Sequence, residues 1–264
     1  MRIQTFPFMK ACALGNDFVM VPGSFLPPDQ EFKTLSIRLA DRRYGIGCDQ
    51  VIYWYELDSP HSWHVRFFNA DGSEAESCGN GTRCVAKFLM DKNNIDSLQL
   101  QTLGGVLQCH LLEPHQVSVD YPPPFYDCTV DIGFVKAQPV YVNVGNPHLV
   151  CFVEDNFDDK VWGPLLETRL HQSHSGYPER VNVGFATVVE GDILNLRVWE
   201  RGAGFTPACG TGACAAAVAA RARGFWKGDG MVRQQGGDLT LRFLQDRLVL
   251  EGEAHLVYRG DYPL

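Results

Sequence analysis

Two short segments of this chain match each other, and each carries a cysteine at the same place. Residues 68–72 lead into a Cys-Gly-Asn-Gly run that begins at Cys78, and residues 199–203 lead into a Cys-Gly-Thr-Gly run that begins at Cys209. The segments align without a gap at an offset of 131 residues, which is the separation of the two cysteines. Two matched thiols that face one substrate could remove a proton from one side of a carbon atom and return a proton on the other side.

A second pair of matching segments lies upstream. Gly-Asn-Asp-Phe at 15–18 and Gly-Asn-Pro-His at 145–148 are 130 residues apart. A half-chain that was used twice explains both pairs, with one Cys-Gly-x-Gly run in each half. The duplication predicts two lobes of roughly 120 to 130 residues.

Cys78 and Cys209 each precede two glycines and a predicted helix. A helix N-terminus offers unpaired N–H groups and partial positive charge, so it could bind a carboxylate, and glycine lets the backbone approach a ligand closely. It also lowers the pKa of a thiol from about 8.5, which favours the thiolate. The alternative is a small buried residue before a tight turn, the commonest role of free cysteine. Repetition favours the functional interpretation, whereas we interpret the other cysteines as structural: Cys12, Cys48, Cys84, Cys109, Cys128, Cys151 and Cys214.

Several polar residues near the repeats are further candidates. Glu200 could sense a thiol or a substrate ammonium group, and Arg201 could bind both oxygens of one carboxylate. The alternative for both residues is that they only form part of a solvated rim. His148 follows the second Gly-Asn, although a lone histidine is more often structural. Neutral amides lie in turn-rich segments, where turn formation is their ordinary role: Asn16, Gln50, Asn69, Asn146 and Asn182.

The elements that must position these residues are mostly strands. Alternating apolar residues predict strands at 51–55, 65–69, 98–102, 117–121, 141–144, 193–199, 239–243 and 248–251. Residues 31–43 predict a helix that ends before Gly45 as a C-terminal cap, and 162–171 predict another.

Two further helices are predicted directly after the glycines of the repeats, at 82–91 and 213–223. The second is nearly all alanine on its buried side, which suits a central helix that a sheet wraps closely. The run Tyr121-Pro122-Pro123-Pro124 is the best break between the lobes.

Composition narrows the class of protein. The chain has 264 residues, of which 45% are hydrophobic and 20% charged, as in ordinary soluble globular proteins. A formal net charge of −8 without a basic block counts against nucleic acid and anionic membranes as partners. Residues 1–8 show no export signal, and no apolar run approaches the ~18 residues of a transmembrane helix.

The nine cysteines indicate reduced thiols rather than a disulfide framework, because their number is odd and they are spread along the chain. None forms a Cys-x-x-Cys pair, and neither repeat places two thiols on one helix face, so we expect no zinc site. The turn at 45–47 lacks the third glycine of a dinucleotide-binding loop.

A series of motifs, taken in order, resembles the diaminopimelate epimerase family: 14–18, 45–50, 68–74, 78–84, 145–148, 178–182, 200–204 and 208–214. The resemblance covers nearly the whole chain. It implies an α/β (α+β) fold of two pseudo-symmetric lobes, each a curled, mostly antiparallel sheet around a central helix, with the site in the cleft between the lobes. We expect an N-terminal lobe at 1–120, to which 253–264 return, and a C-terminal lobe at 121–252.

The resemblance also implies a cytoplasmic, homodimeric enzyme that converts LL-diaminopimelate to the meso form without a cofactor, for lysine and peptidoglycan synthesis. Carried over by position, Cys78 and Cys209 are the base and acid pair, and His148 and Glu200 tune the thiols. The backbone at Gly79-Asn80 and Gly210-Thr211 holds the reacting carboxylate. The remaining positions contact the rest of the substrate: Asn16, Gln50, Asn69, Asn146, Asn182, Glu200 and Arg201.

The chain departs from the family pattern at a few positions. Ala13 stands where glycine is usual, Thr211 stands where serine is often found, and Phe205 and Pro207 replace polar residues before Cys209. A proline or hydroxyproline racemase is the nearest alternative, although Arg201, Asn69 and Asn182 favour a substrate with a second carboxylate. A thiol-based redox sensor or an amino-acid-binding module is the alternative from another class.

Overall fold

In a computed structural model the chain forms two compact units, residues 1–119 with 252–264, and residues 120–251. The structure describes residues 5–26, 31–133, 137–154, 156–173, 176–245 and 247–263. Residues 1–4, part of the segment expected to lack an export signal, and residue 264, part of the segment expected to return to the N-terminal lobe, lie outside the described residues. The chain passes between the units within β8 (Gln116–Tyr121) and within β17 (Arg247–Glu253).

The first unit is built on a sheet with the strand order β18-β1-β2-β3-β4-β6-β7. Neighbouring strands are antiparallel except for β2–β3 and β4–β6, and the short β5 pairs with β4. The elements of this unit are β1 (Thr5–Ala13), β2 (Asn16–Pro22), η1 (Gly23–Phe25), α1 (Phe32–Ala40), β3 (Gln50–Glu56), β4 (Ser62–Asn69), β5 (Glu74–Ala75), α2 (Gly79–Asn93), β6 (Ser97–Thr102), β7 (Gly105–Glu113) and β18 (His255–Pro263).

The second unit repeats this plan, with the strand order β9-β10-β11-β12-β13-β15-β16-β17. Its parallel pairs, β11–β12 and β13–β15, occupy the places of β2–β3 and β4–β6, and the short β14 pairs with β13 as β5 does with β4. Its other elements are β9 (Phe125–Asp127), β10 (Val140–Asn143), β11 (Pro147–Phe152), α3 (Asp159–Ser173), β12 (Asn182–Val189), β13 (Ile193–Glu200), β14 (Gly204–Phe205), α4 (Gly210–Ala222), β15 (Gly230–Gln234) and β16 (Gly237–Leu244).

The duplication extends to single hydrogen bonds. Gly104 N donates to the carbonyl of Glu76, two residues before Cys78, at 2.7 Å. Gly236 N makes the same bond to the carbonyl of Pro207, two residues before Cys209, at 2.8 Å. Pro207 therefore keeps this contact of the loop, because the contact uses its carbonyl and not the N–H that proline lacks.

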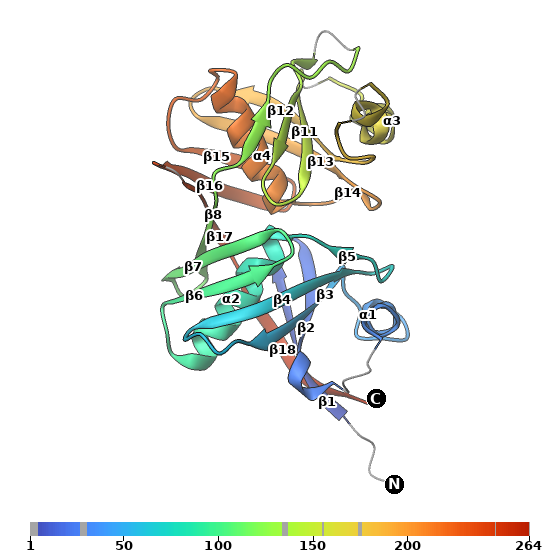
Figure 1. The fold of residues 1–264 in the computed structure, drawn as a ribbon, viewed down its shortest axis with the longest axis vertical. Helices are drawn as coiled ribbons and strands as arrows, with labels where there is room; N and C mark the ends of the chain where they lie inside the picture. Colours follow the sequence, from blue (N-terminus) through green and yellow to red (C-terminus); the bar gives the residue numbers. More distant parts are fainter. Residues whose placement is uncertain are drawn as a thin grey trace. The chain divides into compact units, whose positions relative to one another are not determined.

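Each unit places a helix against each face of its sheet (Figure 1). In β3, Val51 and Tyr53 join the apolar cluster that α1 covers, while Ile52 points the other way, toward Gly81 of α2. In the second unit α3 covers the corresponding cluster, and α4 contacts strands from β10 to β16. The first eleven residues of α4 are all buried, in agreement with the alanine-rich central helix expected from the sequence.

The predicted fold class is confirmed, and all eight predicted strands are present, as β3, β4, β6, β8, β10, β13, β16 and β17. The helix boundaries need correction. The first helix ends at Ala40, and Gly45 is not its cap, because Asp41 has already left helical geometry. The two helices of the repeats begin at Gly79 and Gly210, so the glycines form their first turns rather than preceding them.

Candidate functional site

Cys78 and Cys209 are the N-cap residues of α2 and α4. Each has an extended backbone, and each sulfur accepts a hydrogen bond from the N–H three residues later, from Gly81 at 3.3 Å and from Gly212 at 3.4 Å. A cap of this kind uses one of the N–H groups that a helix leaves at its start. Both thiols thus lie at the positive end of a helix, where a thiolate or a bound anion is favoured.

The second glycine of each repeat is required by close packing. A Cβ on Gly81 would lie 3.0 Å from both Ile52 Cδ1 and Phe67 Cε1, and 3.3 Å from the sulfur of Cys78. A Cβ on Gly212 would lie 2.9 Å from Val198 Cγ2 and 3.2 Å from the sulfur of Cys209. The glycine lets the first helical turn approach the sheet and keeps the sulfur in its capping position.

The thiol of Cys209 is linked to a buried histidine through Thr211. The sulfur lies 3.6 Å from Thr211 Oγ1, which lies 3.1 Å from His148 Nε2 and 3.2 Å from Asn146 Nδ2. His148 Nε2 also lies 3.0 Å from Asn146 Oδ1. His148 therefore reaches the thiol through the hydroxyl of Thr211, a side-chain contact beyond the backbone role that the resemblance implies for this residue.

The proton positions in this chain follow from burial. Burial, and secondarily the charge of Arg201, lowers the pKa of His148 to about 3, so the ring is neutral at physiological pH. Its Nδ1 meets no hydrogen-bond partner among the described residues, so we place the single ring proton on Nε2. His148 Nε2 then donates to Thr211 Oγ1 or to Asn146 Oδ1, and Asn146 Nδ2 donates to Thr211 Oγ1. Because the Thr211 oxygen accepts these hydrogen bonds, its hydroxyl proton is left to be donated to the Cys209 sulfur.

The surroundings of Cys78 are different. Asn80 occupies the position equivalent to Thr211, and its Oδ1 accepts from Arg83 Nη2 at 2.9 Å. Arg83 is fully buried, and its guanidinium also donates to the carbonyls of Gly79 at 3.2 Å and Glu253 at 3.3 Å. A buried positive charge thus lies beneath the first turn of α2, where the second unit has Cys214.

Two of the predicted amides meet on adjacent strands. Gln50 and Asn69 are directly paired between β3 and β4, and Gln50 Nε2 donates to Asn69 Oδ1 at 2.8 Å. Asn69 Nδ2 donates in turn to Ser73 Oγ at 3.0 Å. Gln50 Oε1 is buried and meets no partner among the described residues, so it is the acceptor that a ligand could use.

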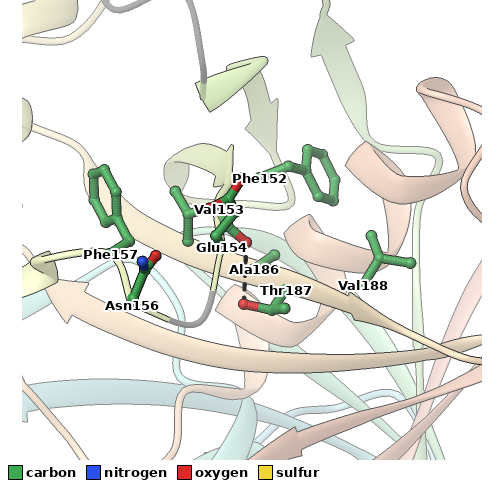
Figure 2. Close-up of a pocket in the computed structure, with 8 residues that line it drawn as sticks. All are labelled: Phe152, Val153, Glu154, Asn156, Phe157, Ala186, Thr187 and Val188. Atoms are coloured by element: carbon green, nitrogen blue, oxygen red, sulfur yellow. Dashed lines mark hydrogen bonds between the residues drawn. The ribbon is translucent and has the colours of Figure 1, made fainter.

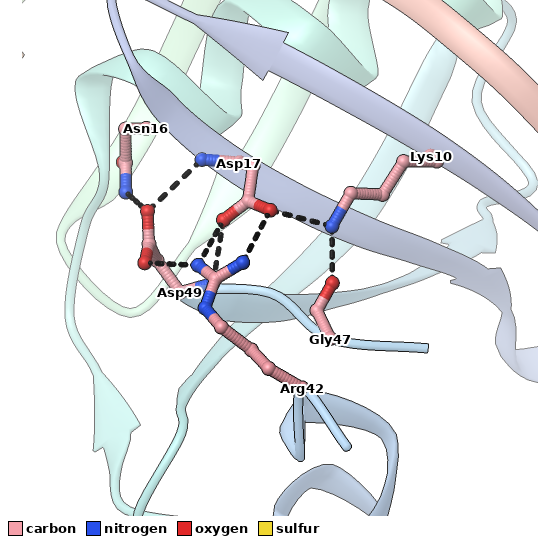
Figure 3. A network of polar contacts seen from close by, with 6 residues as sticks. All are labelled: Lys10, Asn16, Asp17, Arg42, Gly47 and Asp49. Carbon is pink, nitrogen blue, oxygen red and sulfur yellow. Dashed lines mark hydrogen bonds and ion pairs between the residues drawn. The ribbon is translucent and has the colours of Figure 1, made fainter. Parts of the chain in front are cut away.

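Asn16 belongs to a charged network at the start of β2 (Figure 3). Its Nδ2 donates to Asp49 Oδ2 at 2.6 Å, and Asp17 N donates to the same oxygen at 3.0 Å. Arg42 joins Asp17 and Asp49, with shortest contacts of 2.7 Å to each, and Lys10 pairs with Asp17 at 2.6 Å. Burial raises the pKa of Asp17, but hydrogen bonds from Arg42 and Lys10 outweigh it and hold that pKa well below its usual range.

Asn182, Glu200 and Arg201 gather at the turn between β13 and β14. Asn182 Oδ1 accepts from the backbone N–H of Arg201 at 2.9 Å, and its Nδ2 donates to the carbonyl of Pro147 at 3.0 Å. Glu200 accepts a hydrogen bond from Thr206. Asn182 therefore ties together backbone on both sides of it, a structural task that the sequence did not reveal.

Sequence reasoning also missed Gln234, at the end of β15. Its side chain brackets the backbone of Cys209, accepting from the cysteine N–H at 2.8 Å and donating to the cysteine carbonyl at 3.3 Å. No motif marks this residue, because it lies 25 residues beyond the cysteine and meets it only through the fold.

A pocket of about 420 Å³ lies elsewhere in the second unit, beside β11 and β12 (Figure 2). Thr187 Oγ1 donates to the carbonyl of Val153 at 3.2 Å within it. None of the predicted site residues is among the described residues that line this pocket, and Glu154 is the one charged residue in that described lining. It therefore carries no chemistry related to the repeats.

Within the described ranges, no group of three or more His, Cys, Asp or Glu side chains is arranged to hold a metal ion. In the same part of the chain, no helix has both the length and the apolar character needed to cross a membrane.

Comparison of the sequence with known proteins shows which family it matches. The sequence profile of the family described as diaminopimelate epimerase matches residues 8–124 and 140–257. The diaminopimelate epimerase of Phenylobacterium zucineum is 39% identical over 276 residues, which cover 97% of this chain and 98% of that protein. The diaminopimelate epimerase of Acidiphilium cryptum is 38% identical and covers 97% of this chain and 95% of its own.

Solved structures share the fold at much lower identity. A hydroxyproline epimerase from Agrobacterium vitis, solved with bound trans-4-hydroxy-L-proline, has a TM-score of 0.75 at 15% identity and covers 99% of this chain and 93% of its own. A phenazine biosynthesis protein of the PhzF family from Bacillus anthracis has a TM-score of 0.74 at 15% identity and covers 98% of this chain and 99% of its own. These similarities show the fold alone.

Proposed function

We propose that this chain, which belongs to the diaminopimelate epimerase family, inverts one α-carbon of LL-diaminopimelate to give the meso form by a two-base reaction that uses no cofactor. The observation that carries the proposal is the pair of cysteines, each capping a helix in the same geometry in each half of the chain. The product would serve as a precursor for lysine and peptidoglycan.

The α-proton of an amino acid is a very weak acid, so the carbanion that forms needs strong electrostatic help. The N–H groups of the first turns of α2 and α4, at Gly79-Asn80 and Gly210-Thr211, would bind the reacting carboxylate as its charge grows. In this proposal the exclusion of water around the bound substrate strengthens these contacts.

The proton balance assigns one role to each cysteine. One thiolate takes the α-proton and becomes a thiol, and the other thiol donates its proton to the opposite face and becomes a thiolate. The reverse reaction exchanges the roles. The Thr211 hydroxyl, held by His148 and Asn146, would stabilise Cys209 in its thiolate form by donating to the sulfur. Because His148 is neutral, it would act through this hydroxyl and not as a charged partner.

The remaining predicted residues would bind the rest of the substrate. Arg201 would bind the distal carboxylate, because a planar guanidinium can donate two parallel hydrogen bonds to it. Asn16, Gln50 and Asn69 would contribute from the first unit, with the buried Gln50 Oε1 as an acceptor for an ammonium group. Asn146, Asn182 and Glu200 would contribute from the second unit, with Glu200 as a further tuning group.

Two broader features belong to the same proposal. We expect one lobe at 1–120, with 253–264, and a second lobe at 121–252. We also expect two copies of the chain to form a homodimer that works in the cytoplasm. None of the nine cysteines, all of which lie within the described ranges, forms a disulfide in the structure, which suits a reducing compartment.

The test is incubation with LL-diaminopimelate in heavy water, followed by NMR at the α-carbon. We expect the meso form to appear with deuterium at the inverted carbon. Proline and trans-4-hydroxyproline are the comparison substrates, and faster inversion of either would replace the proposed substrate with that of a racemase. Absence of exchange in all three, with thiols that still oxidise reversibly, would instead identify a redox sensor.

A further inference from the structure

We propose that Glu167 is a positioning residue that fixes the turn carrying Glu200 and Arg201, and so sets the selectivity for the distal carboxylate. The inference deepens the proposed function and rests on it. Glu167 lies in the middle of α3, outside every repeated motif, and it is 6% exposed. A buried carboxylate at such a place requires partners that satisfy its charge.

Glu167 has a donor on each of its oxygens. Oε1 accepts from Arg180, with a closest contact of 2.5 Å, and from the backbone N–H of Gly202 at 3.2 Å. Oε2 accepts from the indole N–H of Trp199 at 2.8 Å. The backbone carbonyl of Glu167 accepts from Val181 N at 2.9 Å. One residue thus holds both ends of the 199–202 segment and the segment that leads to Asn182.

The first unit holds the corresponding turn in another way. There Asp71, inside the turn, accepts from the N–H of Ser73 at 2.8 Å and also from its hydroxyl at 2.6 Å. In the second copy the residue aligned with Asp71 is Gly202, which has no side chain and a φ of 78°. The second turn therefore lacks the side-chain acceptor that Asp71 supplies in the first, and Glu167 of α3 supplies a carboxylate that accepts from the N–H of Gly202.

The fit of α3 against this turn is close. A Cβ on Gly163 would lie 2.9 Å from the ring of Trp199, so the helix approaches the indole as near as glycine allows. Phe205 packs on the other strand of the hairpin, edge-on to Trp199 with ring centroids 5.4 Å apart. Trp199 is thus fixed in position to donate its N–H to Glu167.

Arg201 depends on this arrangement through its backbone. The turn closes with Ala203 N donating to the carbonyl of Glu200 at 3.0 Å, and Arg201 N donates to Asn182 Oδ1 at 2.9 Å. Glu167 accepts hydrogen bonds from Gly202, which follows Arg201 in the chain, and from Val181, which precedes Asn182. Loss of its charge would let the turn shift, and the guanidinium would lose the fixed approach that a two-point carboxylate contact requires.

The variant for the test is Glu167→Gln, which keeps the size of the side chain. An amide has one acceptor and one donor group, so its NH₂ must face Trp199 or the Arg180 and Gly202 donors, and at least one contact is lost. The matched control is Asp159→Asn. Asp159 pairs with Arg197 and so also joins α3 to β13, but away from the turn. Trp199→Phe is a second variant, which removes the indole donor to Glu167 together with part of the ring that packs beside Gly163.

Two measurements separate positioning from general stability. Hydrogen exchange by mass spectrometry should show faster exchange in peptides covering 199–205 for Glu167→Gln and Trp199→Phe, but not for Asp159→Asn, and it needs no activity. With diaminopimelate, KM should rise on the order of tenfold or more for Glu167→Gln, as expected when hydrogen bonds to a charged group are lost. Alkylation of Cys78 and Cys209 by iodoacetamide should stay near the wild-type rate.

Equal KM and equal exchange in the 199–205 peptides for Glu167→Gln and Asp159→Asn would overturn the inference while the wild type remained an active epimerase. If the wild type showed no epimerisation, the proposed function would fail instead, and the exchange data would still decide whether Glu167 holds the turn. If Glu167→Gln does not fold, Trp199→Phe decides, and unchanged exchange and unchanged KM in it would overturn the inference.

Discussion

At the scale of single residues, the two thiols share a cap but differ in the group beside them. Thr211 offers Cys209 a hydroxyl that a buried, neutral His148 orients. Cys78 has Asn80 in that place, with its amide oxygen turned to a buried arginine. The repeated sequence indicated that the two cysteines are equivalent. Their surroundings differ because of His148 in β11 and Arg83 inside α2, which no spacing in the sequence connects to the cysteines.

The hydroxyl at Thr211 leads to a direct prediction. Thr211→Val keeps the shape of the side chain but removes the donor to the Cys209 sulfur, so kcat/KM for diaminopimelate should fall about 10- to 100-fold, as for a hydrogen bond to a charged group. Thr211→Ser keeps the hydroxyl and should retain most of the activity. Steady-state kinetics and the pH dependence of Cys209 alkylation check this, and equal activity of the Val and Ser variants would contradict the role of the hydroxyl.

At the scale of elements, the helix start and the strand beneath it position each thiol together. The cap needs the N–H of Gly81 or Gly212, and the close approach needs the absence of a Cβ there. A repeated glycine in the sequence indicated a turn before a helix. The structure shows a helical turn pressed against a strand, a distinction that only the packing can make.

Gly212→Ala should test that packing. Alanine has the higher helix propensity, but its Cβ would lie 2.9 Å from Val198 and 3.2 Å from the Cys209 sulfur. Overpacking costs about 1–3 kcal/mol, which exceeds the propensity gain, so we expect a lower melting temperature and lower activity. Gly184→Ala is the matched control, because the added Cβ would lie no closer than 3.4 Å to its nearest neighbour, Leu196 Cδ1. A Gly212→Ala protein with wild-type stability and activity would show that the close approach is not required.

The sequence predicted strands where apolar residues alternate, and it passed over strands in which that alternation was not recognised. β11 is buried at every residue, so it has no polar side to mark it. Site residues inside motifs were predictable because the motif is local. Gln234 and Glu167 were not, because each meets the site only after α3 or β15 has packed.

At the scale of the whole molecule, the repeated strand order matches a duplicated half-chain, with each copy supplying one capped thiol. The same interior that holds the second thiol also makes the stability of the protein depend on pH. His148 is fully buried and neutral, and its pKa of about 3 lies below the ordinary value of about 6.5 in the unfolded chain.

The sign of that dependence follows from proton binding. Below about pH 6.5 the unfolded chain binds a proton at His148 that the folded protein does not bind, so stability should decrease as the pH falls from 6.5 toward 3. Urea unfolding at pH 7, 6 and 5 should show this loss before most carboxylates titrate. In His148→Gln the decrease over this window should be smaller. An equal decrease in both proteins would mean that His148 is not the group responsible.

The central claim is that two cysteines act on opposite faces of one carbon, and the distribution of deuterium at low conversion tests it most directly. LL-diaminopimelate in heavy water, stopped after a few per cent conversion, should give meso product that carries deuterium at the inverted carbon, while the remaining substrate keeps its hydrogen. Cys78→Ala and Cys209→Ala should each abolish inversion, whereas Cys84→Ala and Cys214→Ala should retain most of it. Product that keeps the original hydrogen, or substantial inversion by either Cys78→Ala or Cys209→Ala, would contradict the two-base account.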